Sequence, residues 1–285
     1  MSHFNLVLVI PHPRMHGLKG YREIMDTVQW GLHALGHEVS ISENRFKPGV
    51  RNIVFGAQML TLRELEQVWP DTIVYNLEQL RNLDPAALNP VFRQIAQKFQ
   101  VWDYSAGNLA AWQQLGARLP VRHVPVGWAP VLQRIAQPPE QDIEVLIYGM
   151  PSEARNASFS AMGQQGISCL MLCGLYGPAR DALIARAKIV LNASLYTRSD
   201  VFEIARVSYL LANRKCVLSL KRPGMFIEAD IEQVVAWCEP DTLVQRCYDL
   251  LENDAARAAL GEAGESAMRQ RDIRTLLQKA LISLE

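Results

Sequence analysis

Two opposite charges stand near the start of an otherwise apolar segment, which reads SDVFEIARVSYLLANRKCVLS. Glu203 and Arg206 lie three residues apart, and the following positions are apolar on nearly all sides of a helix. Such a helix is buried between layers, so only its ends meet solvent or a ligand. Its N-terminus would favour phosphate oxygens, Arg206 would add a two-pronged donor, and Glu203 would accept hydrogen bonds from sugar or ribose hydroxyls. The spacing also fits an ordinary capping box, with Asp200 as the cap and Arg206 as an i,i+3 partner of Glu203.

Two loops of the second half have compatible chemistry. In YGMPSEARN, Gly149 would let the backbone approach a ligand closely, Ser152 can donate to phosphate, and Arg155 brings a positive charge. In CGLYGPARD, glycines flank Tyr176, which could lie against a nucleobase. Both loops also have plainer interpretations. The first is then a turn with an N-cap serine, and the second is a glycine turn before a helix that starts with proline.

All six histidines occur in the first half, and two of them follow its first apolar run. His12 and His16 lie in PHPRMHGLKGYRE, the loop expected at the ligand-binding edge of a parallel sheet. A histidine there is a candidate general base, because its ordinary pKa lies near neutrality. An exposed loop histidine without a catalytic role is the alternative for each of them.

Polar side chains end two further apolar runs of the first half. Asn76 and Glu78 lie in YNLEQL, and Asp103 and Tyr104 lie in WDYS. All four side chains can bind hydroxyl groups. Asn76, Glu78, Asp103 and Tyr104 are therefore candidates for binding hydroxyl groups of a ligand.

Several function classes are disfavoured by what the sequence lacks. Lys and Arg number 29, and so do Asp and Glu, so there is no basic excess that would indicate a nucleic-acid partner. The sequence has no P-loop pattern, no G-x-G-x-x-G after the first apolar run, and no G-x-S-x-G. It also has no H-E-x-x-H and no C-x-x-C. We therefore expect no metal and no nicotinamide cofactor, although Cys169 and Cys173 remain a remote candidate pair for a metal.

The N-terminal apolar run is too short for a membrane span. FNLVLVI is followed by proline and has no basic flank, so it predicts a buried strand and neither a signal peptide nor a transmembrane segment. The five cysteines are an odd number in apolar surroundings, which is typical of free thiols in a reducing compartment. We expect a cytoplasmic protein.

Strand-like and helix-like stretches alternate along both halves of the chain, which predicts two parallel α/β sheets. The expected strands are 4–10, 38–42, 51–57, 71–79, 99–105, 121–127, 143–149, 167–174, 188–194, 215–220 and 232–238. The proline-rich stretch 131–142 predicts a linker between an N-terminal domain (1–130) and a C-terminal domain (143–285). The last helix could pack back on the N-terminal domain. The predicted fold is α/β, with two Rossmann-like doubly wound domains that face each other across a cleft.

The pattern as a whole resembles the GT-B superfamily of glycosyltransferases, in particular bacterial proteins related to the spore-maturation CgeB family. The resemblance runs from about residue 5 to 270, and the motifs that carry it are IVYNLEQL, VWDYS, VPVGWAP, VLIYG, YGPARDALIARAKIVLNAS, FEIARVSYLLANRKCVLS and PDTLVQRCYDLLENDAARAALGEAG. It implies that the C-terminal domain holds a nucleotide-sugar and that the N-terminal domain shapes the acceptor site. On that interpretation Asn76, Asp103 and Tyr104 lie on the acceptor side, and His16, His12 or Glu78 would orient or deprotonate an acceptor hydroxyl. The donor-binding positions implied by the resemblance are Gly149, Ser152, Arg155, Asn192, Glu203 and Arg206.

The sequence departs from the family pattern in three ways. Many retaining members carry a second glutamate eight residues after the first, where this sequence has Leu211. The loop with Arg155 has one arginine where relatives often have a basic pair, and the chain is short for two such domains.

These observations leave two principal functions open. One is metal-independent transfer of a sugar from a nucleotide-diphosphate sugar to the hydroxyl or amine of an unknown glycan, peptide or small molecule, with no cofactor besides the donor. The other is a catalytically weak or inactive nucleotide-sugar-binding subunit that assists a partner enzyme. A two-lobed sugar-binding protein of the periplasmic type is a third possibility, which the missing signal peptide disfavours.

Overall fold

The chain forms two compact units, each built on its own parallel sheet. Unit 1 contains residues 1–129 and 271–285, and unit 2 contains residues 130–270. The computed structural model describes residues 2–12, 16–84, 88–195 and 200–282, and among residues 16–18 it describes the backbone alone. No helix in these ranges is both apolar enough and long enough to span a bilayer.

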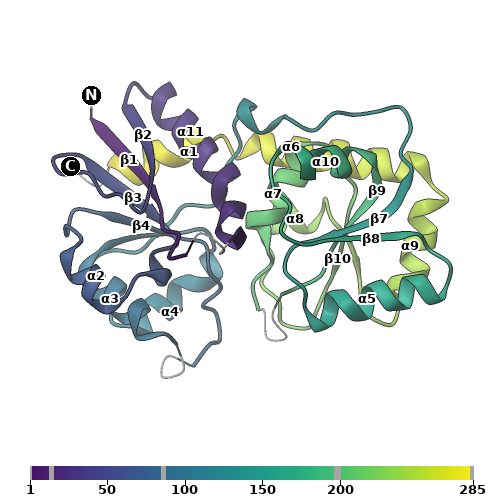
Figure 1. Cartoon of the computed structure of the whole chain (residues 1–285), viewed down its shortest axis with the longest axis horizontal. Coiled ribbons are helices and arrows are strands. Elements are labelled where there is room, and N and C mark those ends of the chain that lie inside the picture. The colour runs from purple at the N-terminus through teal and green to yellow at the C-terminus, as the bar shows by residue number, and fades with distance from the viewer. Residues whose placement is uncertain (1, 13–15, 85–87, 196–199, 283–285) are drawn as a thin grey trace. The chain divides into compact units, whose positions relative to one another are not determined.

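Unit 1 has a six-stranded sheet in the order β2-β1-β3-β4-β5-β6, and all its neighbouring strands are parallel. Its strands are β1 (His3–Leu8), β2 (Glu38–Glu43), β3 (Arg51–Phe55), β4 (Ile73–Asn76), β5 (Gln100–Asp103) and β6 (Arg122–His123). Its helices are η1 (His16–Tyr21), α1 (Arg22–Ala34), η2 (Ala57–Met59), α2 (Leu62–Gln67), α3 (Pro90–Lys98), η3 (Ala106–Asn108), α4 (Leu109–Gln114) and α11 (Ile273–Leu281). Helices α2, α3 and α4 cover one face of this sheet, and α1 and α11 cover the other (Figure 1).

Unit 2 has a five-stranded parallel sheet in the order β11-β10-β9-β7-β8. Its strands are β7 (Ile143–Tyr148), β8 (Cys169–Leu172), β9 (Ala187–Asn192), β10 (Val217–Leu220) and β11 (Ala236–Cys238). Its helices are η4 (Pro130–Leu132), α5 (Glu153–Gln164), α6 (Pro178–Arg186), α7 (Ile204–Ala212), α8 (Ala229–Glu232), α9 (Leu243–Leu251) and α10 (Asp254–Gln270). Helices α5 and α9 lie on one face, and α6, α7 and α10 lie on the other (Figure 1).

Burial on both faces explains why the strands read as continuous apolar runs. In β7 five of the six residues are buried, and the same is true of β9. A strand that alternated apolar and polar residues would leave one face unable to pack against helices. The doubly wound α/β architecture expected from the sequence is therefore present in each unit.

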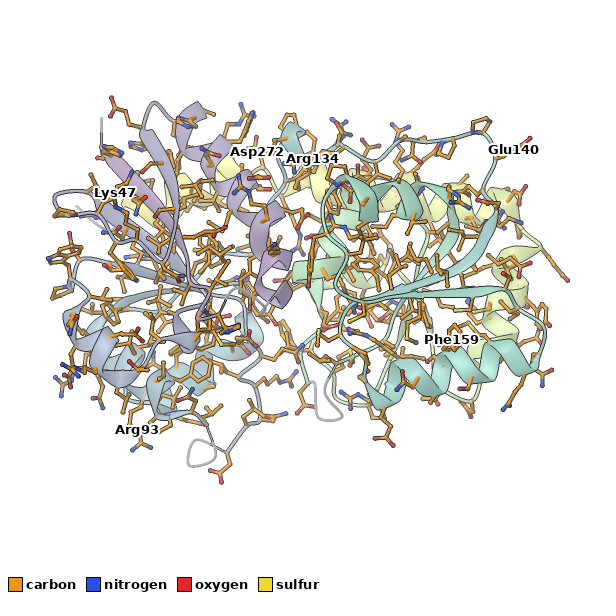
Figure 2. The ribbon with its side chains drawn as sticks, in the orientation of Figure 1. Lys47, Arg93, Arg134, Glu140, Phe159 and Asp272 are labelled. Atoms are coloured by element: carbon orange, nitrogen blue, oxygen red, sulfur yellow. The ribbon has the colours of Figure 1, made fainter. Side chains whose placement is uncertain are left out.

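The stretch 131–142 is part of unit 2 and not a free linker. The backbone N–H groups of Arg134 and Ile135 both donate to Oδ1 of Asn213 at 2.9 Å, and Asn213 Nδ2 donates to the carbonyl of Leu132 at 2.8 Å. Figure 2 labels Arg134 and Glu140 near the two ends of this stretch. Its prolines indicated a linker. In the structure, however, the side chains of Leu132 and Ile135 are buried, and Asn213 makes hydrogen bonds to the backbone of this segment.

The chain returns to unit 1 beside the point where it left. The N–H of Trp128 donates to the carbonyl of Arg271 at 2.8 Å, and the N–H of Ile273 donates to the carbonyl of Trp128 at 3.1 Å. Helix α11 then packs on α1 at Gly31, where an added Cβ would lie 2.8 Å from atoms of both Ile273 and Leu277. A glycine at this position of α1 therefore makes room for the last helix.

Candidate functional site

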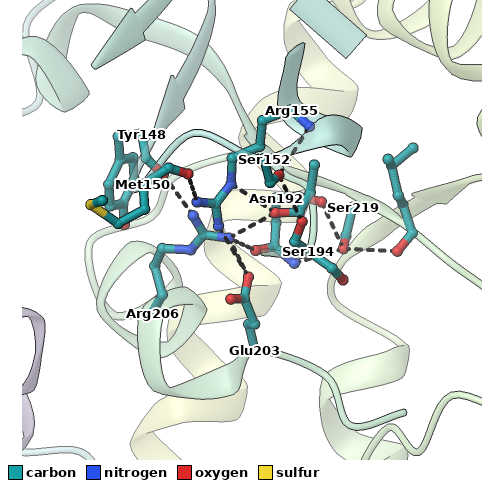
Figure 3. A network of polar contacts seen from close by, with 11 residues as sticks. Tyr148, Met150, Ser152, Arg155, Asn192, Ser194, Glu203, Arg206 and Ser219 are labelled. Atoms are coloured by element: carbon teal, nitrogen blue, oxygen red, sulfur yellow. Dashed lines mark hydrogen bonds and ion pairs between the residues drawn. The ribbon is translucent and has the colours of Figure 1, made fainter. Parts of the chain in front are cut away.

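Polar side chains from several loops of unit 2 converge at the carboxyl edge of its sheet (Figure 3). Strand β7 ends at Tyr148 and is followed by Gly149, while the neighbouring strand β9 ends at Asn192. Helices α5 and α7 follow these two strands along the chain and supply Arg155 and Arg206. Ligands of open α/β sheets bind at this edge, so the cluster is the candidate site of unit 2.

Arg206 is held by oxygens of both strand ends and of its own helix start. Its Nη1 donates to the carbonyl of Tyr148 at 2.6 Å. Its Nη2 donates to Asn192 Oδ1, to Glu203 Oε2 and, at 3.3 Å, to the carbonyl of Ala193. The side chain keeps 18% of its surface exposed, so a ligand can still reach it.

Arg155 lies deeper in the same cluster. Its Nε donates to the carbonyl of Ala193 at 3.0 Å, its Nη1 donates to the carbonyl of Met150, and its Nη2 lies 3.6 Å from Glu203 Oε2. Burial, followed by the positive charge of Arg206, lowers the pKa of Arg155 to about 10. The group therefore stays charged at neutral pH, and the cluster contains two cations for one carboxylate.

Gly149 is required where the two guanidinium groups meet the backbone. Its φ is +125°, a conformation that L side chains rarely adopt. A Cβ at this position would lie 2.7 Å from Nη1 of Arg155 and 3.1 Å from Nη1 of Arg206. Both cations thus lie against the bare backbone just beyond β7.

The helix that carries Arg206 begins later than the sequence indicated, and the alternative interpretation of Asp200 and Glu203 as a capping box is wrong. Helix α7 starts at Ile204, and the residue before it makes no capping bond through its side chain. Residues 200–202 are extended instead: the N–H of Phe202 donates to the carbonyl of Phe226 at 3.0 Å, and the N–H of Phe226 donates to the carbonyl of Asp200 at 2.8 Å. This pairing buries Val201 and Phe202, and that burial outweighs a local cap.

Two residues predicted to bind the donor, Ser152 and Asn192, make hydrogen bonds to other residues of the chain in this structure. Ser152 is the N-cap of α5: its Oγ accepts from the N–H of Arg155 at 3.3 Å and donates to the carbonyl of Ser194 at 3.0 Å. Asn192 is buried, donates to Ser219 Oγ at 2.9 Å and accepts from Arg206. Asn192 therefore positions Arg206, and the N-cap interpretation of the first loop is the one observed.

A second group of aromatic and charged side chains was not anticipated from the sequence. The guanidinium carbon of the buried Arg180 lies 5.9 Å from the ring centre of Tyr148 and 4.9 Å from that of Tyr209. Asp181 lies 2.7 Å from Arg180 Nη2 and accepts from the Tyr209 hydroxyl at 2.7 Å. The guanidinium carbon of Arg206 is 5.5 Å from the same Tyr148 ring centre, so this ring lies near two cations.

The loop before α6 has the glycine geometry that the sequence indicated. Gly174 and Gly177 have φ values of +73° and +64°, and Pro178 is the first residue of the helix. Tyr176 lies half-buried between these glycines. Arg180 and Asp181, which are adjacent in the first turn of α6, were the sequence feature from which the group around Tyr148 and Tyr209 could have been predicted.

Glu78 is the focus of the corresponding edge of unit 1. Its Oε1 accepts from the Tyr21 hydroxyl at 2.6 Å and from Gln58 Nε2 at 2.8 Å. These side chains come from the loops after β4, β1 and β3, which end at the same edge of the sheet. Burial and the Glu78 charge raise the pKa of Tyr21 well above its ordinary value, so the hydroxyl remains a donor.

The acceptor-side residues expected beside Glu78 lie inside the fold. Asp103 is 0% exposed, and its carboxylate accepts from Trp112 Nε1 at 2.6 Å and from Asn76 Nδ2 at 2.7 Å, as well as from one backbone and one further side-chain donor. Burial raises its pKa to about 6, although these hydrogen bonds oppose the shift. Tyr104 is also buried. Asp103, Asn76 and Tyr104 therefore have no direct access to an acceptor, because the strand ends turn into the core.

Asn76 links this buried network to Glu78. Its Nδ2 also donates to the carbonyl of Glu78 at 2.9 Å, and Asn108 Nδ2 donates to the same oxygen at 2.9 Å. The buried network thus holds the backbone carbonyl of Glu78 in place through two hydrogen bonds. His12 is exposed, and the side chain of His16 lies outside the described residues.

The described residues contain no group of three or more His, Cys, Asp or Glu arranged to hold a metal ion. Cys169 is half-buried and Cys173 is exposed, whereas Cys216, Cys238 and Cys247 are buried free thiols.

Comparison with known proteins supports the architecture. No family model and no curated protein matches this sequence. Among solved structures, AviGT4, a glycosyltransferase involved in avilamycin A biosynthesis, is 16% identical with a TM-score of 0.62, covering 100% of this chain and 97% of that chain. Anabaena Alr3699/HepE in complex with UDP and glucose is 11% identical with a TM-score of 0.66, covering 100% and 99%. WaaG, a glycosyltransferase of lipopolysaccharide biosynthesis, is 12% identical with a TM-score of 0.60, covering 100% and 99%. At these identities the likeness establishes the fold, and the expected two Rossmann-like domains of the GT-B type are confirmed.

Proposed function

We propose that this chain is a glycosyltransferase that transfers a sugar from a nucleotide-diphosphate sugar to an acceptor hydroxyl or amine without a metal ion. The observation that carries the proposal is the pair of guanidinium groups, Arg155 and Arg206, against the backbone at Gly149 on the carboxyl edge of the unit 2 sheet. The bound UDP and UDP-glucose named for the HepE structures support this ligand class.

The chemistry follows from charge. When the bond between the sugar and the diphosphate breaks, negative charge accumulates on the departing phosphate. Preorganised cations stabilise that charge most when they are already fixed in a partly dry site. Arg155 and Arg206 meet this condition, because backbone carbonyls and Asn192 hold them in place. Gly149, Tyr176 and Glu203 complete the proposed donor site, and Ser152 supports it as the N-cap of the helix that carries Arg155.

The proposed acceptor group lies in unit 1. Glu78 is the best supported of the three candidates, since two donors fix its Oε1 while its Oε2 accepts no hydrogen bond within the described structure. A carboxylate held in this way can orient an acceptor hydroxyl and accept its proton. His12 and His16 remain candidates for the same role.

Ligand-induced stabilisation tests the donor site. Thermal unfolding would be measured with uridine, guanosine, cytidine and thymidine diphosphates and with their sugar conjugates. A ligand at one hundred times its Kd stabilises the folded state by about 2.7 kcal/mol. We expect one base to give this shift, and we expect slow release of free nucleoside diphosphate from its sugar conjugate, with water as the acceptor.

Two arginine variants make the test specific. Arg206→Ala should abolish the ligand-induced shift. Arg246→Ala should retain it, because Arg246 is a half-exposed arginine of α9 in the same unit. If folded Arg206→Ala protein binds nucleoside diphosphates as well as the unmodified chain does, the donor site has been misplaced. Binding without any turnover would instead indicate a nucleotide-sugar-binding subunit.

A further inference from the structure

Two buried asparagine side chains hold the backbone of residues 78–81, which we call the Glu78 loop. Asn76 Oδ1 accepts from the N–H of Glu78 at 3.2 Å, and its Nδ2 donates to the carbonyl of Glu78 at 2.9 Å. Asn108 Oδ1 accepts from the N–H groups of Leu80 and Arg81 at 2.9 and 3.1 Å, and its Nδ2 donates to the same Glu78 carbonyl at 2.9 Å. The main-chain polar groups of the loop are therefore bound by side chains from inside the fold.

One carboxylate decides which way both amides point. Asp103 Oδ2 accepts from Asn76 Nδ2 at 2.7 Å, and its Oδ1 accepts from Asn108 Nδ2 at 3.0 Å. The pKa of Asp103, which burial raises to about 6, still leaves the group mostly ionised at pH 7, and an ionised carboxylate can only accept hydrogen bonds. Each asparagine must therefore turn its NH2 group toward Asp103, which leaves both amide oxygens facing the N–H groups of the Glu78 loop.

The side chain of Glu78 depends on where this backbone is held. Its Oε1 is tied to the Tyr21 hydroxyl and to Gln58 Nε2, which come from two other loops. With one oxygen fixed in this way, a shift of the Glu78 backbone must either break these two bonds or turn Oε2 to a new position. Reacting groups tolerate little displacement, because a misplacement of about 1 Å can cost about 100-fold in rate.

From this arrangement we propose that Asp103 is a positioning residue for Glu78, which acts through the amides of Asn76 and Asn108 on the backbone of the Glu78 loop. Asp103 is fully buried and does not itself contact the acceptor. The inference rests on the proposed function, because it assumes that Glu78 contacts the acceptor. It assigns a role in the transfer to a strand-end carboxylate that the fold hides from any ligand.

Hydrogen exchange tests the positioning without a substrate. Mass spectrometry would follow the exchange of peptides that cover the Glu78 loop at pH 7 in the unmodified chain, in Asp103→Asn and in Asn108→Ala. Circular dichroism would confirm that each variant is folded, and Asn108→Ala carries the test if Asp103→Asn does not fold. We expect both variants to exchange the amide hydrogens of the loop at least about tenfold faster, because their acceptors are turned away or lost.

Asn52→Ala is the matched control for Asn108→Ala. Asn52 is likewise 0% exposed in unit 1, and its side chain bonds to Asn5 and to the backbone of Lys47 and Val50. The control variant should also lose stability, because it too removes a buried amide that holds a loop. It should leave the exchange of the Glu78 loop and the rate of turnover unchanged.

Release of UDP from UDP-glucose, with water as the acceptor, tests the consequence for transfer. We expect Asp103→Asn and Asn108→Ala each to lower kcat about tenfold and to leave the KM for UDP-glucose within about twofold, since the proposed donor site lies in unit 2. Glu78→Gln should lower kcat by about 100-fold. In the Glu78→Gln background, Asp103→Asn should lower kcat by no more than about twofold, because the group that it positions is already gone. A simple loss of folded protein would lower kcat equally in both backgrounds.

The outcomes separate this inference from the proposed function. If the Glu78 loop exchanges at the same rate in all variants, or if Asp103→Asn lowers kcat equally with and without Glu78→Gln, the inference fails and the proposed function stands. Equal kinetic effects of Asn108→Ala and Asn52→Ala would also refute the inference. If the unmodified chain releases no nucleoside diphosphate from UDP-glucose or from the other sugar conjugates, the proposed function fails, and the role of Asp103 in transfer fails with it.

Discussion

Replacement of Gly149 by alanine tests whether the two guanidinium groups depend on a bare backbone beyond β7. The new methyl group would lie 2.7 Å from Nη1 of Arg155, closer than real contacts allow, and 3.1 Å from Nη1 of Arg206. Both side chains would have to shift away from the strand end. Because their carbonyl partners are fixed in the sheet and in the loops that follow it, such a shift breaks hydrogen bonds that hold the cations in place.

Two contributions set the size of the effect. A φ of +125° is strained for alanine, which costs about 1–3 kcal/mol of folding stability. Displacement of the cations adds a binding defect, and we expect pyrophosphate to bind at least about tenfold more weakly, or about 1.4 kcal/mol. Circular dichroism during thermal unfolding gives the first quantity and calorimetric titration gives the second.

Gly166→Ala is the matched control. Gly166 also has a positive φ, +80°, but a Cβ there would meet nothing within 4 Å, and it lies in the turn between α5 and β8. It should lose stability through backbone strain and keep its affinity for pyrophosphate. If Gly149→Ala and Gly166→Ala were equal in both measurements, the close approach of the guanidinium groups would have no consequence, and the reasoning about the donor site would be refuted.

Four further substitutions have definite expected results in urea-unfolding experiments. Asp103→Asn should lower the stability of unit 1 by about 1–3 kcal/mol at pH 7, because the new amide would present a donor to groups that are themselves donors; an unchanged unfolding midpoint would contradict this. Lys215→Met should stabilise unit 2 at pH 7. Burial lowers the pKa of Lys215 to about 8 in the folded chain, whereas the ordinary pKa of lysine is 10.5. Between these two pH values the unfolded chain binds more protons than the folded chain, so the stability of the unmodified chain should rise with pH across that range. This rise should be absent in Lys215→Met. Gly261→Ala should destabilise unit 2, because its Cβ would overlap the backbone carbonyl of Arg214, whereas Gly163→Ala on α5 should stabilise it by about 0.5–1 kcal/mol; equal effects of the two would be evidence against the packing of α10 on α7.

The fold could be predicted because its strongest signals are local. Strands such as β7 and β9 must be apolar on both sides when helices cover both faces of a sheet. Their sequences therefore predict a parallel α/β unit. The start of α7 could not be read in this way. Residues 200–202 pair with residue 226, which is distant in sequence, and a local capping pattern carries no information about such a partner.

The sequence predicted where the residues of the candidate site lie, but not which of them contact each other. Gly149, Arg155, Glu203 and Arg206 follow strands that end at one edge, and the structure brings these four together. Glu203 contacts both arginines because β7 and β9 are neighbours in the sheet. The sequence of neither strand predicts which strand lies beside it.

Burial of the unit 1 carboxylate illustrates the same limit. Asp103 ends a strand just as a ligand-binding residue would, but its hydrogen-bond donors include side chains on β4 and α4. Which way a polar strand end turns is decided by such tertiary neighbours.

The division of the chain has a consequence for biosynthesis. Unit 2 is one uninterrupted stretch, while unit 1 is interrupted by it and receives α11 only afterwards. Until α11 has been synthesised, the face of α1 at Gly31 therefore lacks the helix that covers it. The nascent first unit must wait for Ile273 and Leu277, so chaperone contact or proteolysis during translation should concentrate on this late-closing surface.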